Sequence, residues 1–201
     1  MSRICASLAC SGIAAAMALT VSAPILAQPY PSKPVKIIVG FAPGGGNDII
    51  ARFIAQRLSS SMGQQFIVEN RPGAGGSIGT ALGVNAPSDG YTLTLISASY
   101  TVHPSVYKLK FDPITDIVPI IQVSEGPFLI VVHPSVPAKT PQELIVLAKS
   151  RPGKLNYATP GQGGITHLAT ELFATMVGIK LNHVPYKGTG PAHSDLLGGQ
   201  V

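Results

Sequence analysis

Three glycine-rich loops carry most of the chemistry that this sequence offers. They span residues 40–46 (GFAPGGG), 70–76 (NRPGAGG) and 160–164 (PGQGG), and each lies between an apolar run and helical sequence. The N-terminus of a helix presents unpaired N–H groups and a partial positive charge, which suit an anion. Glycine lets the backbone approach a ligand closely. The loops therefore predict a site that holds an anionic group with backbone amides and hydroxyls.

Known nucleotide and hydrolase motifs fit these loops poorly. The first loop lacks the Lys and Ser/Thr of a P-loop, and Ile78 and Thr166 stand where the dinucleotide fingerprint has its third glycine. Residues 75–79 (GGSIG) match the G-x-S-x-G of serine hydrolases, but 70–74 separate Ser77 from the preceding strand. We interpret Ser77 as a helix N-cap and keep an exported serine hydrolase as the alternative. The candidate bases for that hydrolase are His103, His167, His183 and His193, with Asp112, Asp116 or Asp195 to orient them.

The sequence gives no sign of a metal site or a cofactor. No two histidines are spaced at i, i+4, and His103-Pro104 and His133-Pro134 are predicted to end strands. Both cysteines, Cys5 and Cys10, lie in an N-terminal segment that has the pattern of a secretory signal peptide. That segment has one basic residue, an apolar run and a small residue, Ala27, at the expected cleavage point. We predict cleavage near Ala27 and export.

The charge of the remaining chain argues against nucleic acid as a partner. Without Arg3, residues 28–201 hold 13 basic and 9 acidic side chains, a net charge of +4, and the basic residues are scattered. A mildly basic exported protein suits a small anionic ligand better.

Alternating strand and helix signals predict an α/β architecture with parallel strands. The strands are expected at 35–39, 66–69, 91–96, 118–123, 128–132, 155–159 and 181–184. Ile50, Ile54 and Leu58, with Phe53, predict a helix that ends at Gly63, and further helices are expected from about Ser77, after Thr140, at 165–177 and from Pro191 to Leu197. Leu168, Leu172 and Met176 are expected on one face of the 165–177 helix. A crossover near 124–127 divides the chain into a signal peptide (1–27) and two domains, 28–124 and 125–201.

Five ordered motifs carry a family resemblance. They are the first glycine loop with Asp48 and Ala51-Arg52, residues 69–76 (ENRPGAGG), 89–93 (DGYTL), 158–161 (ATPG) with His167-Leu168, and 184–188 (VPYKG). In these the chain resembles the Bug substrate-binding receptors of tripartite tricarboxylate transporters over residues 30–201. The resemblance implies a type II-like, two-domain clamp of the periplasmic binding protein class. Such a receptor captures a small carboxylate and delivers it to membrane transporter subunits, without catalysis.

The family's ligand loops correspond here to a defined set of residues. Asn47, Ser77 and Gly164 depart from the side chains usual in the family, which leaves specificity open. Family members are longer, so we expect the second domain, and the segment that returns to the first, to be truncated. The resemblance and the loops together predict ligand contacts at Phe41, Gly44, Gly45, Gly46, Asn47, Asp48, Gly75, Gly76, Ser77, Ser97, Ser99, Thr159, Pro160, Gly161, Gly163, Gly164 and His167.

Overall fold

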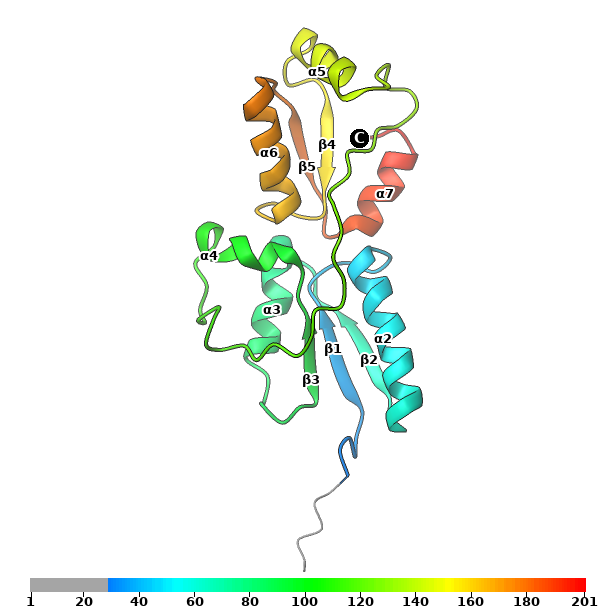
Figure 1. The fold of residues 1–201 in the computed structure, drawn as a ribbon, viewed down its shortest axis with the longest axis vertical. Coiled ribbons are helices and arrows are strands. Elements are labelled where there is room, and N and C mark those ends of the chain that lie inside the picture. Colours follow the sequence, from blue (N-terminus) through cyan, green and yellow to red (C-terminus); the bar gives the residue numbers. More distant parts are fainter. Residues whose placement is uncertain (1–28) are drawn as a thin grey trace, which may run out of the picture. The chain divides into compact units, whose positions relative to one another are not determined.

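The computed structural model describes residues 29–201, and Lys33–Val201 form one compact unit (Figure 1). The predicted signal peptide, with Cys5 and Cys10, lies outside the described residues. The elements are β1 (Val35–Val39), α2 (Gly46–Met62), β2 (Phe66–Asn70), α3 (Ser77–Val84), β3 (Thr92–Leu95), α4 (His103–Val106), α5 (Pro141–Ser150), β4 (Asn156–Thr159), α6 (Ile165–Val177), β5 (Asn182–Pro185) and α7 (Thr189–Leu197). Two 3-10 turns, η1 (Ala74–Gly76) and η2 (Ala98–Val102), precede α3 and α4.

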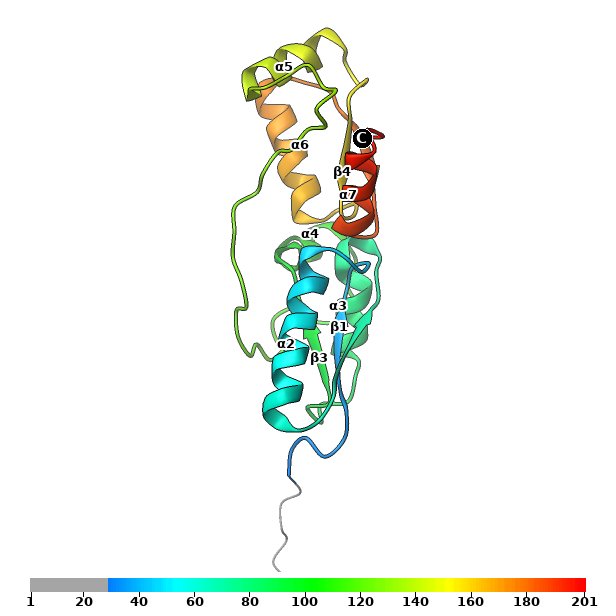
Figure 2. The ribbon, with the colours of Figure 1, turned by 90° about the vertical axis from the view of Figure 1, so that its right-hand side faces the viewer.

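The first sheet is parallel and has the strand order β2-β1-β3. The chain crosses from β1 to β2 through α2, and returns past β1 to β3 through α3. Parallel crossovers are right-handed, so two crossovers in opposite directions place their helices on opposite faces of the sheet. Figure 2 shows α2 and α3 on the two sides of the strands. The carboxyl ends of all three strands consequently lie at one edge, where the glycine loops begin.

The core of this sheet lies around β1 and α2. Val35, Ile37 and Val39 are buried and pack with Phe41 and Phe66. The helix contributes Ala51 and Ala55, spaced i, i+4, because small side chains let it approach the strands closely. Phe53, which stands beside the apolar repeat that predicted this helix, is 57% exposed and lies beneath the Arg57 guanidinium. The predicted stop at Gly63 is confirmed: it has a left-handed φ of 69° and its N–H donates to the Ser59 carbonyl.

The second sheet consists of β4 and β5, which are parallel. Thr140 caps α5 as predicted, with its hydroxyl accepting the Glu143 N–H at 3.2 Å. Ala148, Ala174 and Ile179 form the small core. The prediction that Leu168, Leu172 and Met176 share the buried face of α6 is wrong in part, because Leu172 and Met176 are exposed. Ala174 is buried instead, and Phe173 packs on the core.

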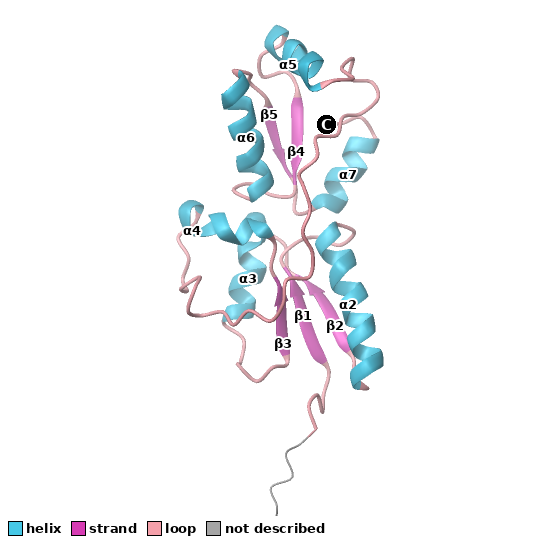
Figure 3. Cartoon of the chain, in the orientation of Figure 1, coloured by secondary structure: helices cyan, strands magenta, loops and turns pink. Residues whose placement is uncertain are grey.

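The strands predicted at 118–123 and 128–132 are absent. Figure 3 shows this stretch as loop, and every residue from 118 to 132 is exposed. A β-branched run becomes a strand only when a neighbouring strand satisfies its N–H and C=O groups. Within the described residues, no strand pairs with this segment. The domain boundary proposed inside it, at 124/125, stays a prediction.

No helix among residues 29–201 is both long enough and apolar enough to cross a membrane.

The different burial of β1 and the 118–132 segment gives a stability prediction. We expect Val39→Ala to lower the free energy of unfolding by roughly 2 kcal/mol, because it removes two buried methyl groups and leaves a cavity. Ile130→Ser should change it by no more than about 0.5 kcal/mol, because Ile130 is 64% exposed. Urea denaturation followed by circular dichroism measures both. Equal losses for the two variants would mean that the apolar segment is packed in solution.

Candidate functional site

Four helices, not three, begin at glycine loops that follow the carboxyl ends of parallel strands. Ligands of open α/β sheets bind at such edges. The fourth loop was missed because we placed the start of the last helix at Pro191, whereas α7 begins at Thr189 with Gly188 as N-cap. A signal was present in the sequence: KGTG at 187–190 directly follows the run that forms β5.

The second glycine loop packs against both the first and the third. A Cβ at Gly40 would lie 2.6 Å from the Gly76 carbonyl oxygen, so backbone meets backbone directly. A Cβ at Gly161 would lie 2.9 Å from the Gly75 Cα, although Gly161 itself has no left-handed φ. Side chains of any other residue type would force these loops apart.

The first loop also packs against the fourth. The Ala42 N–H donates to the Lys187 carbonyl at 2.8 Å. A Cβ at Gly45 would overlap the Thr189 hydroxyl, and one at Gly44 would touch the Gly190 Cα at 3.9 Å. The four loops therefore form one connected layer of backbone.

Unused amide donors remain at the starts of two of these helices. In α2 the first intrahelical hydrogen bond runs from the Ile49 N–H to the Gly45 carbonyl. The N–H groups of residues 46–48 therefore have no acceptor within the helix. In α6 the first runs from the Leu168 N–H to the Gly164 carbonyl. The Ile165 N–H is taken by the Ser99 hydroxyl at 3.1 Å, which links η2 to α6. Amides of this kind hold a carboxylate without any cationic side chain.

Asp48 organises the first loop. The residue is 4% exposed. Its carboxylate accepts hydrogen bonds from the Gly44 N–H at 3.0 Å, from the Arg52 Nε at 3.0 and 3.1 Å, and from the Asn70 side-chain amide at 2.9 Å. Asn70 donates to the Phe41 carbonyl as well, at 3.0 Å. Burial raises the pKa of Asp48, but the hydrogen bonds from Arg52, Gly44 and Asn70 outweigh it and leave the pKa below its usual value. The carboxylate is therefore ionised and fully engaged by the protein.

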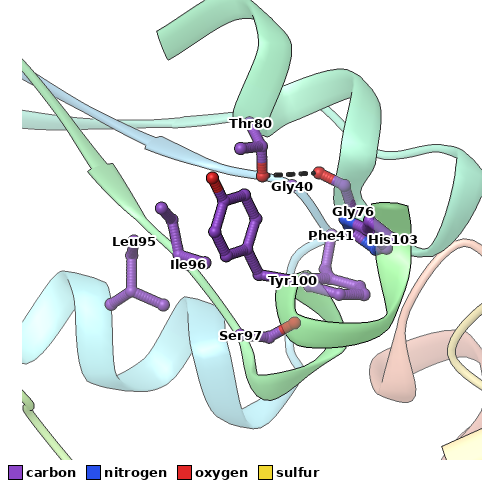
Figure 4. Close-up of a pocket in the computed structure, with 9 residues that line it drawn as sticks. All are labelled: Gly40, Phe41, Gly76, Thr80, Leu95, Ile96, Ser97, Tyr100 and His103. Carbon is purple, nitrogen blue, oxygen red and sulfur yellow. Dashed lines mark hydrogen bonds between the residues drawn. The ribbon is translucent and has the colours of Figure 1, made fainter. Parts of the chain in front are cut away.

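A narrow pocket lies where the first two loops meet the end of β3 (Figure 4). It is nowhere wide enough for a water molecule. Thr80 donates its hydroxyl to the Gly76 carbonyl at 3.1 Å, and the Tyr100 ring lies among the other lining side chains. The lining residues are Gly40, Phe41, Gly76, Thr80, Leu95, Ile96, Ser97, Tyr100 and His103.

Three histidines hold the glycine loops in place. His103 is 1% exposed and its Nε2 lies 3.1 Å from the Gly75 carbonyl, so this nitrogen donates. Burial lowers the pKa of His103, opposed by the bond to Gly75. His167 accepts the Gly163 N–H at its Nδ1, and His183 bonds the Thr159 hydroxyl at 2.7 Å. The placing of His103 and His133 at strand ends was wrong: His103 begins α4 and His133 lies in a loop.

The predicted site residues fall into separate groups. Three of them line the narrow pocket: Phe41, Gly76 and Ser97. Those in the packed layer between the second and third loops are Gly75, Ser99, Thr159, Gly161, Gly163, Gly164 and His167. Those at the start of α2 are Gly44, Gly45, Gly46, Asn47 and Asp48. Ser77 and Pro160 are half-buried beside these groups. Sequence reasoning missed Gly40, Thr80, Tyr100, His103 and the 187–190 loop.

The structure offers no support for the hydrolase alternative. Ser77 is the first residue of α3 and not its N-cap, which is Gly76 in a left-handed conformation. His103 is the candidate base nearest to Ser77 in sequence, and its Nε2 is hydrogen-bonded to the Gly75 carbonyl. Within residues 29–201, no group of three His, Cys, Asp or Glu side chains is arranged to hold a metal ion.

The Asp48 network predicts a pH-dependent stability. We expect Asp48→Asn to lower the free energy of unfolding at pH 7 by roughly 1–2 kcal/mol, since it weakens charge-assisted bonds to a half-exposed Arg52. The folded pKa of Asp48 lies below its unfolded value, so the stabilisation is present above about pH 4 and is lost as the pH falls through the folded pKa. The difference between variant and wild type should therefore shrink in acid.

Urea denaturation at pH 7, 5 and 3 measures this difference. Glu125→Gln is the control, because Glu125 is exposed and makes one long contact, 3.4 Å, with Gln122. A difference that is constant from pH 7 to pH 3 would contradict the assignment.

Comparisons with known proteins agree with this geometry. Residues 50–201 match the family described as tripartite tricarboxylate transporter family receptor. Protein BugT of Bordetella pertussis is 42% identical over 188 residues, which are 90% of this chain and 56% of BugT. An R. palustris protein solved with adipate is 38% identical with a TM-score of 0.81, and MatC from Rhodopseudomonas palustris, solved with bound malate, is 31% identical with a TM-score of 0.77.

Each structural match covers 86% of this chain, and 58% and 59% respectively of those two proteins. The chain thus spans somewhat more than half the length of these relatives. The fold is, as predicted, that of part of a periplasmic binding protein: the structure of periplasmic binding protein BugD is 35% identical, with a TM-score of 0.76, and is covered over 58% of its length. With the family match over residues 50–201 and the four converging loops, the chain belongs to the receptor family of the tripartite tricarboxylate transporters.

Proposed function

We propose that this chain is the ligand-binding part of a periplasmic receptor that captures a small carboxylate for a tripartite tricarboxylate transporter. The observation that carries the proposal is the convergence of four glycine loops, each opening a helix, into one layer of backbone. The helix starts supply N–H donors and partial positive charge at the same edge of the fold. The role is binding and delivery, without catalysis.

The donor set favours a carboxylate over an uncharged ligand. The free groups at the starts of α2 and α6 are N–H donors, and carboxylate oxygens only accept. Asp48 adds no competing charge, because Arg52 neutralises it. The hydroxyls of a sugar both donate and accept, so backbone N–H donors alone would satisfy only part of them.

Two relatives support the ligand class. The R. palustris protein was solved with adipate and MatC with malate, both of which are dicarboxylates. This chain is similar to both over 86% of its residues. Export through the predicted signal peptide, and transfer of the ligand to membrane subunits, are parts of the same proposal.

A ligand screen tests the proposed function. We expect adipate, malate or another small di- or tricarboxylate to raise the melting temperature of residues 28–201, because a ligand that binds only the folded state stabilises it by mass action. Glucose and other neutral sugars should have no effect. Differential scanning fluorimetry followed by calorimetry makes the measurement. Sugar binding together with silence toward every carboxylate would overturn the proposal.

The glycine layer gives a second prediction. Gly161→Ala should weaken binding of the carboxylate found in that screen by tenfold or more, because its Cβ would push the third loop away from Gly75. The backbone of Gly161 is not left-handed, so the variant tests the contact and not backbone strain.

The matched control for Gly161→Ala is Gly126→Ala. A Cβ at Gly126 would meet nothing within 4 Å. Calorimetric titration of both variants at pH 7.5 makes the comparison. Equal affinity for the two would show that the close approach of the second and third loops is dispensable for binding.

A further inference from the structure

His167 and His183 form a stacked pair behind the third glycine loop. Their ring centroids are 4.1 Å apart with planes inclined by 24°, and the Tyr157 ring stacks on His183 at 4.8 Å. His167 comes from α6, His183 from β5 and Tyr157 from β4. The stack therefore joins β4, α6 and β5 next to the third glycine loop.

Hydrogen bonds connect the two histidines to both ends of the third glycine loop. At the far end, the Nδ1 of His167 accepts the Gly163 N–H at 3.2 Å. At the near end, Thr159 is 2% exposed and its hydroxyl lies 3.3 Å from the Gly161 carbonyl and 2.7 Å from the His183 Nε2. Gly163 is left-handed, with φ 68°, and the neighbouring Gln162 carbonyl is taken by the Tyr107 hydroxyl at 2.6 Å. The orientation of the 161–164 peptides thus depends on these bonds.

The bond from Gly163 fixes the charge state of His167. A backbone N–H can only donate, so the Nδ1 of His167 must carry a lone pair and its proton must be on Nε2. Protonation of Nδ1 would place its N–H opposite the Gly163 N–H, so the hydrogen bond between them would be lost. The second imidazole, 4.1 Å away, makes a charge on both rings still more costly.

The titratable groups in contact with the stack or the loop include the two imidazoles, Tyr157, Glu171 and Tyr107. The Glu171 carboxylate accepts the Tyr157 hydroxyl, and burial raises the pKa of Tyr107, whose hydroxyl donates to the loop. Burial and then His167 lower the pKa of His183, against the pull of Glu171. Burial and the bond to Glu171 raise the pKa of Tyr157, so the phenol stays neutral.

We propose that His167 is a positioning residue for ligand binding: as a neutral imidazole, braced by His183, it holds the Gly163 peptide and the third glycine loop in the shape that receives the carboxylate. This rests on the proposed function and goes beyond it, since His167 then acts through the loop and not by contact with the ligand. Acid releases the loop, so the receptor loses affinity as the pH falls through the imidazole range.

The first test needs no ligand. The ¹⁵N–¹H resonance of Gly163 is followed from pH 8 to pH 5 in the ligand-free protein. In wild type it should shift as protonation removes the acceptor at the His167 Nδ1. In His167→Asn, whose side-chain oxygen keeps an acceptor near the place of Nδ1, it should stay nearly constant. His193→Asn, which removes an exposed histidine on α7, should leave the wild-type curve unchanged. A Gly163 resonance that ignores pH in wild type, or that titrates alike in His167→Asn, would overturn the proposal.

The second test measures affinity for adipate and malate by calorimetry at pH 8, 7 and 6. Wild type should bind up to tenfold more weakly for each pH unit below the midpoint measured for the Gly163 resonance, because only the neutral fraction is competent. His167→Asn should bind within about twofold of wild type at pH 8 and keep that affinity at pH 6, whereas His167→Leu, which lacks the acceptor, should bind about tenfold more weakly throughout. Ligand protonation is common to all variants and cancels in the comparison.

The two possible failures are distinct. If neither dicarboxylate binds at any pH, the proposed ligand class fails and the Gly163 titration still decides the role of His167. If a dicarboxylate binds with the same pH profile in wild type and in His167→Asn, the positioning role fails and the receptor function stands.

Discussion

Direct contact between glycine backbones is the constraint on which this structure depends. Gly40 lies against Gly76, and Gly75 against Gly161, at distances that leave no space for a Cβ. Because the strands within each sheet are parallel, the carboxyl edge of the first sheet collects the starts of α2 and α3, and that of the second sheet the starts of α6 and α7. The glycines that allow the loops to pack closely therefore also bring the backbone N–H donors together. Under the proposed function, these donors take the place of charged side chains in binding the anion.

Loops without side chains need anchors from elsewhere, and buried polar groups supply them. Asp48 binds the first loop through the Gly44 N–H, and His103 binds the second through the Gly75 carbonyl. His167 binds the third through the Gly163 N–H. Each anchor is a titratable side chain: hydrogen bonds from the protein keep Asp48 ionised, and the bond at the His167 Nδ1 needs a lone pair on that nitrogen. Under the proposal for His167, the shape of the site is linked to protonation without contact between that side chain and the ligand.

Much of the frame follows from the sequence, because strand runs and glycine stops are local signals. The runs at 35–39 and 66–69, and the stop at Gly63, are in place to within a residue. The apolar run at 118–132 shows the limit: its residues favour a strand, but pairing depends on a partner that local sequence does not reveal. Burial on α2 and α6 fell on Ala51, Ala55 and Ala174 because close helix packing selects small side chains over large ones.

The site was predictable as loops but not as a network. Glycine spacing marks where backbone amides are exposed, and it would have found the 187–190 loop had the helix start been placed two residues earlier. The bonds from Asn70 to Asp48 and from Gly163 to His167 join positions by geometry that no local pattern encodes. Under the proposed function, a backbone layer recognises only the carboxylate group, which is common to many acids. Discrimination among those acids must then come from the few side chains at its margin, of which Asn47 and Ser77 directly follow glycines in sequence.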